Sequence, residues 1–168
     1  MGSKMLTGSL MIFGTILTII MLFVEPGGVT EGVTFEVIVQ GLLDNSTLGE
    51  ITGVGWTVGL LAVTIGTVYL ARSMQGEHKP GSDLAGLASI LAFLSAGIVA
   101  ISSGIQIAIF NTEWVDQGGD ITNAWAIGEA AFRSMFMFMG AASLLLGIAI
   151  FRQKDLNQIA GGITGLFG

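Results

Sequence analysis

The chain lacks cysteine and has almost no histidine. None of its 168 residues is cysteine, and His78 is its one histidine. The absence of cysteine excludes disulfides, thiol redox relays and thiolate metal sites. A single histidine excludes a haem held by two histidines and any multi-histidine copper or di-iron centre built from this chain alone. We therefore expect no metal site and no cofactor.

Charge is also scarce. Charged residues make up 11% of the chain, whereas hydrophobic residues make up 52%. This composition is far from that of soluble domains and is typical of a protein whose solvent is the lipid bilayer. The formal net charge of −6 disfavours nucleic acid as a partner. The composition thus predicts an integral membrane protein.

Four apolar runs are long enough to cross a bilayer, which requires about 20 helical residues. Helices are expected because lipid offers no partners to open backbone groups, and because the runs are too uniformly apolar for barrel strands. The expected fold is an all-α, integral membrane four-helix bundle, and residues 1–168 form a single transmembrane domain. The predicted spans are Met5 to Val24, Ile51 to Ala71, Leu84 to about Phe110, and Ala124 to Phe151.

The basic residues indicate the orientation of these spans. Lys4 precedes the first span, Arg72 and Lys79 lie between the second and third, and Arg152 and Lys154 follow the fourth. Neither of the other two loops contains lysine or arginine. Because basic residues collect in cytoplasmic loops, both termini are expected in the cytoplasm of a multi-pass cell-membrane protein, with the acidic loops outside. The positions of tryptophan and tyrosine agree with these span ends, because their side chains settle in the headgroup layer. Trp56, Trp114 and Trp125 fall near predicted outer ends, and Tyr69 falls near an inner end.

The first outer loop contains a short amphipathic segment between Thr34 and Asp44. Its apolar residues recur at helical spacing, which predicts an interfacial helix lying on the bilayer surface, although FEVIV alone would favour a strand. TLGE, which starts at Thr47, has the pattern of a capping box for the second span, and Asn123 is suited to cap the fourth. The triplet NST at Asn45 is either a glycosylation acceptor or part of that cap.

Small residues recur along the predicted spans. Association in lipid depends on close backbone approach at such residues. They serve either the packing of the bundle, which we favour, or contact with another subunit. The predicted packing residues are Gly55, Gly59 and Gly66 in the second span, Ala88, Ala92, Ala96, Ala100 and Gly104 in the third, and Gly140 and Gly147 in the fourth.

A polar cluster is predicted near the outer ends of the third and fourth spans. Glu129 and Arg133 are four residues apart and share a helix face, and Ser102, Ser103 and Gln106 reach a similar depth. The cluster is either an outward-facing pocket for a small ligand or ion, or an interfacial anchor with satisfied polar groups. The anchor is the simpler interpretation.

Other candidate chemistry is weak. Met135 and Met139 share a helix face and Met137 does not, so MFMFM is better explained by packing than by copper binding. His78 is expected to be a solvated loop residue. No charge falls at the middle of a predicted span, which disfavours proton-coupled transport. No protease or hydrolase motif is present, so we expect a non-catalytic protein.

The segments SLLLGIAIFRQKDLNQIAGGITGLFG and GSLMIFGTILTII resemble small multi-pass membrane proteins of archaea and bacteria that have no assigned activity. The resemblance implies a style of fold and no reaction.

Residues 156–168 are expected to dock at the membrane, to re-enter it or to be a truncated further helix. The predicted function is that of a structural or accessory subunit, which packs against itself or within a larger membrane complex such as a membrane-bound oxidoreductase or monooxygenase. The alternative is a small-solute or ion binding or transport protein that uses the polar cluster.

Overall fold

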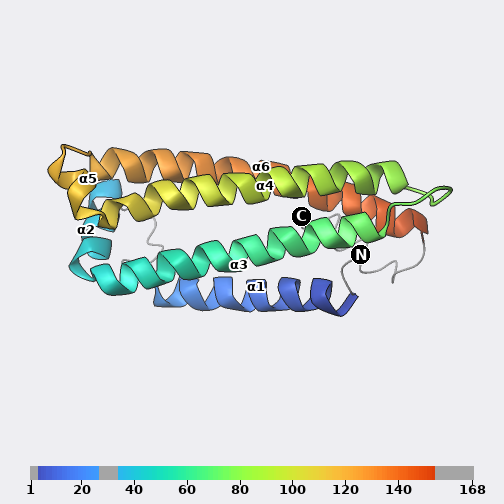
Figure 1. Ribbon diagram of the computed structural model, residues 1–168, viewed down its shortest axis with the longest axis horizontal. Coiled ribbons are helices and arrows are strands. Elements are labelled where there is room, and N and C mark those ends of the chain that lie inside the picture. The colour runs from blue at the N-terminus through green and yellow to red at the C-terminus, as the bar shows by residue number, and fades with distance from the viewer. Residues whose placement is uncertain (1–3, 27–33, 154–168) are drawn as a thin grey trace.

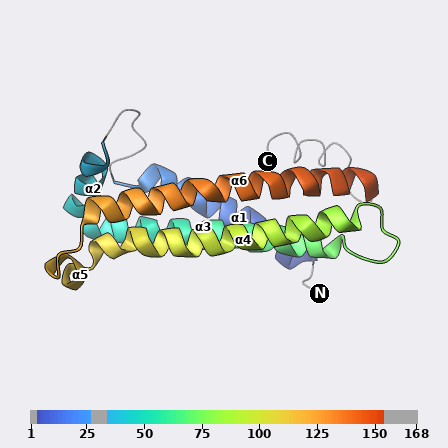
Figure 2. The same ribbon diagram turned by 90° about the horizontal axis from the view of Figure 1, so that it is seen from above.

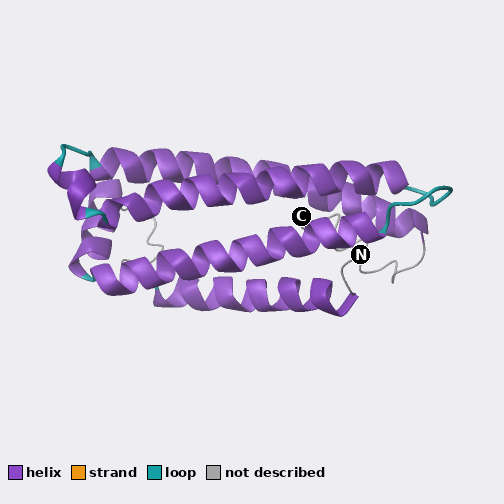
Figure 3. Cartoon of the chain, in the orientation of Figure 1, coloured by secondary structure: helices purple, strands orange, loops and turns teal. Residues whose placement is uncertain are grey.

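The computed structural model describes residues 4–26 and 34–153, and the regular structure within those ranges is entirely helical (Figure 3). Four helices, with α4 continued by η1, are long and apolar enough to cross a membrane, which confirms the prediction of an all-α chain with four such helices. The elements are α1 (Lys4–Val24), α2 (Phe35–Asp44), α3 (Ser46–Ser73), α4 (Ser82–Ile107), the 3-10 turn η1 (Ala108–Phe110), α5 (Thr112–Asp116) and α6 (Ile121–Gln153).

Two helices begin upstream of the residues predicted to cap them. α3 starts at Ser46 and only Asn45 separates it from α2, so Thr47 lies inside its first turn. The N-cap residue Asn45 makes no side-chain capping bond. The predicted capping box is therefore wrong. α6 starts at Ile121, and the Oδ1 atom of Asp120 accepts a hydrogen bond from the backbone N–H of Asn123 at 3.0 Å. Asp120, and not Asn123, thus caps this helix. The predictions for residues 156–168 lie outside the described residues.

The long helices pack in chain order, with α1 along α3, α3 along α4, and α4 along α6. Figure 1 shows α1 and α3 below and α4 and α6 above, and Figure 2 shows the same layers from above. The end that contains the connection between α3 and α4 is called the turn end, and the opposite end, which carries α2 and α5, the α2 end. In Figure 1, α3 lies close to α4 at the turn end and diverges from it toward the α2 end.

Small side chains bring α3, α4 and α6 together at the turn end. Alanine side chains are small enough to allow helix backbones to approach closely. Gly81, just before α4, has φ +79°, and a Cβ there would lie 3.1 Å from the Cα of Ala149. Both the backbone angle and the space therefore require glycine. The cluster comprises Ala71, Met74, Ala85, Ala88, Leu146, Ala149 and Ile150.

Glycines form the seam between α1 and α3. A Cβ on Gly14 would lie 2.6 Å from the carbonyl oxygen of Gly59, and one on Gly59 would meet the hydroxyl of Thr18. A Cβ on Gly66 would meet the side chain of Met11 at 2.7 Å. In the described residues α1 makes no comparable contact with α4 or α6. This seam therefore holds α1 in place.

The segment α2 packs across the divergent end of the helices. Val39 and Leu42 are each only 2% exposed, and Leu42 belongs to a cluster with Ile109 of η1 and Ala124 of α6. The predicted helix between Thr34 and Asp44 is thus present as Phe35–Asp44. Its buried apolar residues contact protein, because the ends of α3 and α6 supply the apolar surface that the sequence prediction had assigned to lipid.

Candidate functional site

The predicted packing residues face different surroundings. Of the α3 glycines, Gly55, Gly59 and Gly66 all face α1, where an added Cβ would meet Met21, Thr18 and Met11 respectively. On α4, the predicted small residues lie in a helix interface only in the part of the helix nearer the turn end. Ala88, Ala92 and Ala96 are buried, whereas Ala100 and Gly104 are exposed. On α6, Gly147 is buried and Gly140 is partly buried.

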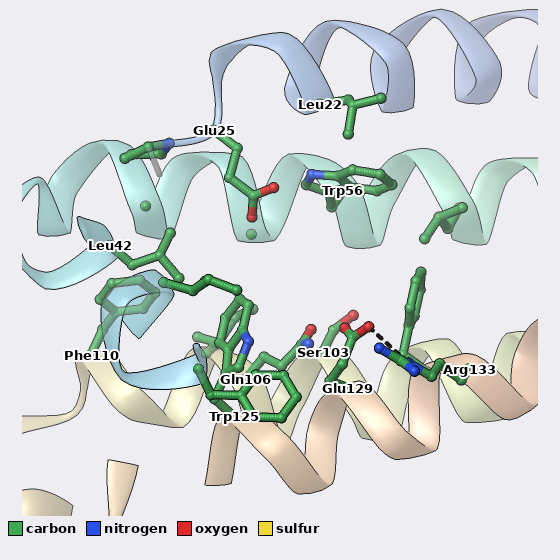
Figure 4. A pocket seen from close by; sticks show the side chains of 18 residues that line it. Leu22, Glu25, Leu42, Trp56, Ser103, Gln106, Phe110, Trp125, Glu129 and Arg133 are labelled. Atoms are coloured by element: carbon green, nitrogen blue, oxygen red, sulfur yellow. Dashed lines mark hydrogen bonds and ion pairs between the residues drawn. The ribbon is translucent and has the colours of Figure 1, made fainter. Parts of the chain in front are cut away.

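A pocket of about 450 Å³ lies at the α2 end, where the two layers of helices diverge (Figure 4). Residues from α1, α2, α3, α4, η1 and α6 and from the segment just after α1 contribute to its wall. Most of the wall is apolar, and its polar groups come from both layers. The lining residues are Leu22, Glu25, Pro26, Phe35, Ile38, Leu42, Gly49, Gly53, Trp56, Leu60, Ser103, Gln106, Ile107, Phe110, Trp125, Glu129, Phe132 and Arg133.

The pocket brings together four of the five residues of the predicted polar cluster. Glu129, Arg133, Gln106 and Ser103 all line it. Ser102 does not line it: its hydroxyl is buried and donates a hydrogen bond to the carbonyl oxygen of Val99 at 3.2 Å. Serine hydroxyls often bond to their own helix in this way. Ser102 is thus a packing residue in this structure.

Glu129 and Arg133 form an ion pair on α6. The Nε of Arg133 donates to Oε1 of Glu129 at 3.3 Å, and their side chains are 72% and 29% exposed respectively. Arg133 therefore lies at the rim of the pocket, while Glu129 lies further inside (Figure 4). An i, i+4 pair this exposed contributes only a few tenths of a kcal/mol in water, so it does little for folding there.

Close packing between α4 and α6 positions these groups. A Cβ on Gly128 would lie 2.6 Å from Cγ of Gln106 and 3.2 Å from the carbonyl oxygen of Ser102. The glycine therefore lets α6 approach α4 directly below the pocket. As a result Glu129, the next residue, faces the same space as Gln106.

A second carboxylate faces the pocket from the opposite layer. Glu25 follows α1 and is partly buried, and Figure 4 shows its carboxyl group pointing toward the indole of Trp56. Burial raises the pKa of Glu25, the nearby N–H of Trp56 lowers it in part, and the charge of Glu129 raises it further. The folded chain thus holds this proton more tightly than the unfolded chain does. Protonation of Glu25 therefore favours folding at low pH, and this contribution is lost as the pH rises through the raised pKa.

Trp56 carries an unused hydrogen-bond donor. Its Nε1 atom is buried and, among the described residues, has no acceptor within hydrogen-bond distance, although it lies close enough to Glu25 to lower the pKa of that carboxyl group. Buried indole N–H groups usually find a partner, so an orphan donor marks a place where an acceptor is expected. Sequence reasoning missed both Glu25 and Trp56 as site residues. From the sequence, Trp56 is expected to be a headgroup aromatic, and Glu25 is given no role in the site.

The other sequence candidates lie away from the pocket. Met135 is buried and Met139 packs beside Val68 and Ala142, whereas Met137 is 77% exposed. His78 is exposed in the turn between α3 and α4. Within residues 4–26 and 34–153, no group of three or more histidine, cysteine or acidic residues is arranged to hold a metal ion.

The arrangement defines a class: an all-helical chain of four long apolar helices with an apolar pocket at one end that contains two carboxylates and one guanidinium. Comparisons with family models, with curated proteins and with solved structures found no match to this chain. Function is therefore inferred from the geometry of the described residues.

Proposed function

We propose that the chain is an integral membrane protein whose α2 end faces outward and binds a small ligand. The length and apolarity of the four long helices support the membrane location, and so do their outward surfaces, which carry many exposed large apolar side chains. The basic residues support the orientation, because Arg72 lies in the last turn of α3 and Lys79 in the turn between α3 and α4. With this orientation the pocket lies at the outer end of the helices.

The orientation can be tested with single cysteines, because the natural chain has none. Gln117, between α5 and α6, and Glu77, in the turn between α3 and α4, are both exposed. In intact cells, a membrane-impermeant maleimide should label Gln117→Cys and should label Glu77→Cys only after permeabilisation. The reverse pattern would overturn the orientation, and equal labelling of both variants in intact cells would overturn the membrane-spanning arrangement.

The pocket carries the proposal of ligand binding. Its volume of about 450 Å³ lies within the range of small-molecule sites, and such sites combine mainly apolar walls with a few polar groups. The wall unites side chains that are far apart in sequence, from Glu25 to Arg133. An interfacial anchor would explain the exposed Glu129–Arg133 pair, but it would leave the buried donor of Trp56 without a role. The proposed activity is binding and involves no catalysis.

Filling the pocket should remove the ligand. A Cβ added to Gly53 would lie 3.6 Å from Cγ1 of Ile107, an ordinary contact, so Gly53→Leu should direct its side chain into the cavity without disrupting the helices. Gly8→Leu is the matched control, because a Cβ there meets nothing within 4 Å. Solvent extracts of the purified natural protein and of Gly8→Leu should contain the same small molecule, and Gly53→Leu should contain several-fold less, as measured by mass spectrometry. Equal amounts in all three, or no retained compound, would contradict the proposal.

A second function, that of an accessory subunit, is favoured by an exposed small-residue face on α4. Gly97, Ala100 and Gly104 are exposed, and a Cβ on either glycine would meet nothing within 4 Å. Small residues allow another helix to pack closely in lipid. A single purification from native membranes would distinguish the two proposed functions. A stoichiometric protein partner that is lost on Gly97→Leu, without any change in small-molecule content, would support the subunit.

A further inference from the structure

We propose that the pocket binds an organic cation, with one positive charge and an apolar body, and that the carboxylate of Glu25 is its counter-charge. The proposal rests on the pocket's being a ligand site. It adds the chemical class of the ligand and assigns a role to Glu25.

The charges around the pocket favour a single positive charge in the ligand. Glu25, Glu129 and Arg133 are the ionisable residues in its wall, and those that line it from α2, α3 and α4 are all uncharged at neutral pH. Arg133 is already paired with Glu129. Within the described part of the chain Glu25 forms no ion pair, and the charge that acts on it is the like charge of another carboxylate, Glu129. A ligand cation would supply the missing partner.

The apolar wall determines the rest of the ligand. Trp56 and Trp125 line the pocket from opposite layers (Figure 4), and Phe110 and Phe132 also belong to its wall. Aromatic faces attract organic cations, and they do so more strongly where water is excluded. A metal ion would find few ligands here, because most of the wall is apolar. An ammonium group with an alkyl or aryl body would use both the carboxylate and the aromatic rings.

The orphan donor of Trp56 fits this arrangement. A bound cation would hold Glu25 in its ionised form, and a carboxylate can accept several hydrogen bonds. The buried Nε1–H of Trp56 faces that carboxyl group, and an ionised carboxylate is a stronger acceptor for this donor than a protonated carboxyl group is. A ligand with a neutral carbonyl oxygen could also accept from Nε1, and it would not need Glu25 to be ionised.

Cation binding should be coupled to proton release. Because burial raises the pKa of Glu25, part of the population is protonated below that pKa. The cation and the proton then compete for the same carboxylate. Affinity for a permanent cation should rise with pH by up to about tenfold per unit below the pKa and level off above it. Glu129 and Arg133 face the same space, and the adjacent carboxylate of Glu129 contributes to the raised pKa.

The experiment compares three probes, one cationic, one neutral and one anionic, on the full-length protein in detergent. Benzyltrimethylammonium carries a permanent positive charge, and tert-butyl phenyl ketone is a neutral molecule of similar size with a carbonyl acceptor. Benzenesulfonate serves as the anionic probe. Isothermal titration calorimetry in two buffers of different ionisation enthalpy measures both affinity and the number of protons released. The ammonium probe should bind most tightly and should release protons near the pKa of Glu25.

Variants assign the effect to Glu25. Glu25→Gln should weaken binding of the ammonium probe by about tenfold or more at pH 8 and should abolish proton release. Arg133→Gln should tighten it, because it removes a positive charge from the rim of the pocket. Glu50→Gln is the matched control: Glu50 is exposed on α3 and does not line the pocket, so affinity should not change. The opposite responses of the Glu25 and Arg133 variants cannot come from a general loss of folding.

The outcomes separate this proposal from the proposed function. If the ketone or the sulfonate binds saturably and more tightly than the ammonium probe, the pocket is a ligand site and the assignment to cations is wrong. Ammonium binding that is unchanged by both Glu25→Gln and pH would also overturn that assignment. If none of the three probes binds saturably, the ligand-site proposal itself fails.

Discussion

Replacing Gly14 with alanine should loosen the contact between α1 and α3. The added Cβ would lie 2.6 Å from the carbonyl oxygen of Gly59 and 2.9 Å from the backbone nitrogen of Val63. Both atoms belong to the backbone of α3, so no side-chain rotation can relieve the contact and the two helices must move apart. Overpacking of this kind costs about 1–3 kcal/mol. The melting temperature in detergent should fall, and α1 should become more sensitive to protease.

The matched control for this variant lies on the same helix. Gly8→Ala places a Cβ where nothing lies within 4 Å, so it should leave the melting temperature unchanged or raise it slightly through helix propensity. Gly14→Val should destabilise the protein more than Gly14→Ala does. Gly8→Val should leave the melting temperature close to that of the natural protein. Equal melting temperatures for Gly14→Ala and Gly8→Ala would show that the glycine seam does not determine the position of α1.

The four long helices could be predicted because each apolar run is long and almost free of charge. Runs such as those of α1 and α4 are too long and too uniformly apolar to be read as strands. Helix starts were predicted less well. Thr47 and Asn123 match capping patterns, but the chain continues its helices upstream of both, to Ser46 and Ile121. Short polar stretches carry too little information to fix a boundary when the flanking helix can extend by one turn.

Four members of the polar cluster could be predicted because depth in a span can be counted from its end. Their partners in the other layer could not be predicted in this way. Glu25 lies next to a proline at the end of an apolar run, where a charged residue ordinarily marks an interface. Its position opposite Glu129 depends on the divergence of the two layers, which is a property of the tertiary arrangement. A better signal in the sequence was the asymmetry in side-chain size along the helices.

That asymmetry connects the packing to the pocket. Alanine dominates where α3, α4 and α6 meet at the turn end, and tryptophan, phenylalanine and glutamine take its place at the α2 end. Helices that are close at one end and separated by larger side chains at the other leave space between those side chains. The segment α2, anchored by Leu42, covers part of that space. The pocket is therefore a consequence of how small and large residues are distributed along the helices.

Gly128→Leu should separate α4 from α6 beneath the pocket and should destabilise the protein more than any single change to the pocket wall. A Cβ at this position already lies 2.6 Å from Cγ of Gln106 and 3.2 Å from the carbonyl oxygen of Ser102, and the rest of a leucine side chain would have no space. We expect a loss of about 3 kcal/mol in the free energy of unfolding, at the upper end for overpacking. The measurement is reversible unfolding in detergent.

A double-mutant cycle identifies which contact is responsible. Gln106→Ala removes the flexible side chain nearest to the new Cβ but leaves the backbone oxygen of Ser102 in place. If the side chain of Gln106 accounts for most of the strain, Gln106→Ala should restore at least half of the stability lost in Gly128→Leu, because residues in contact are not additive. Gly97→Leu should cost little by itself, since a Cβ there meets nothing within 4 Å. Additive effects of Gly128→Leu and Gln106→Ala would instead place the strain on the backbone, and Gly128 would then set the distance between α4 and α6 directly.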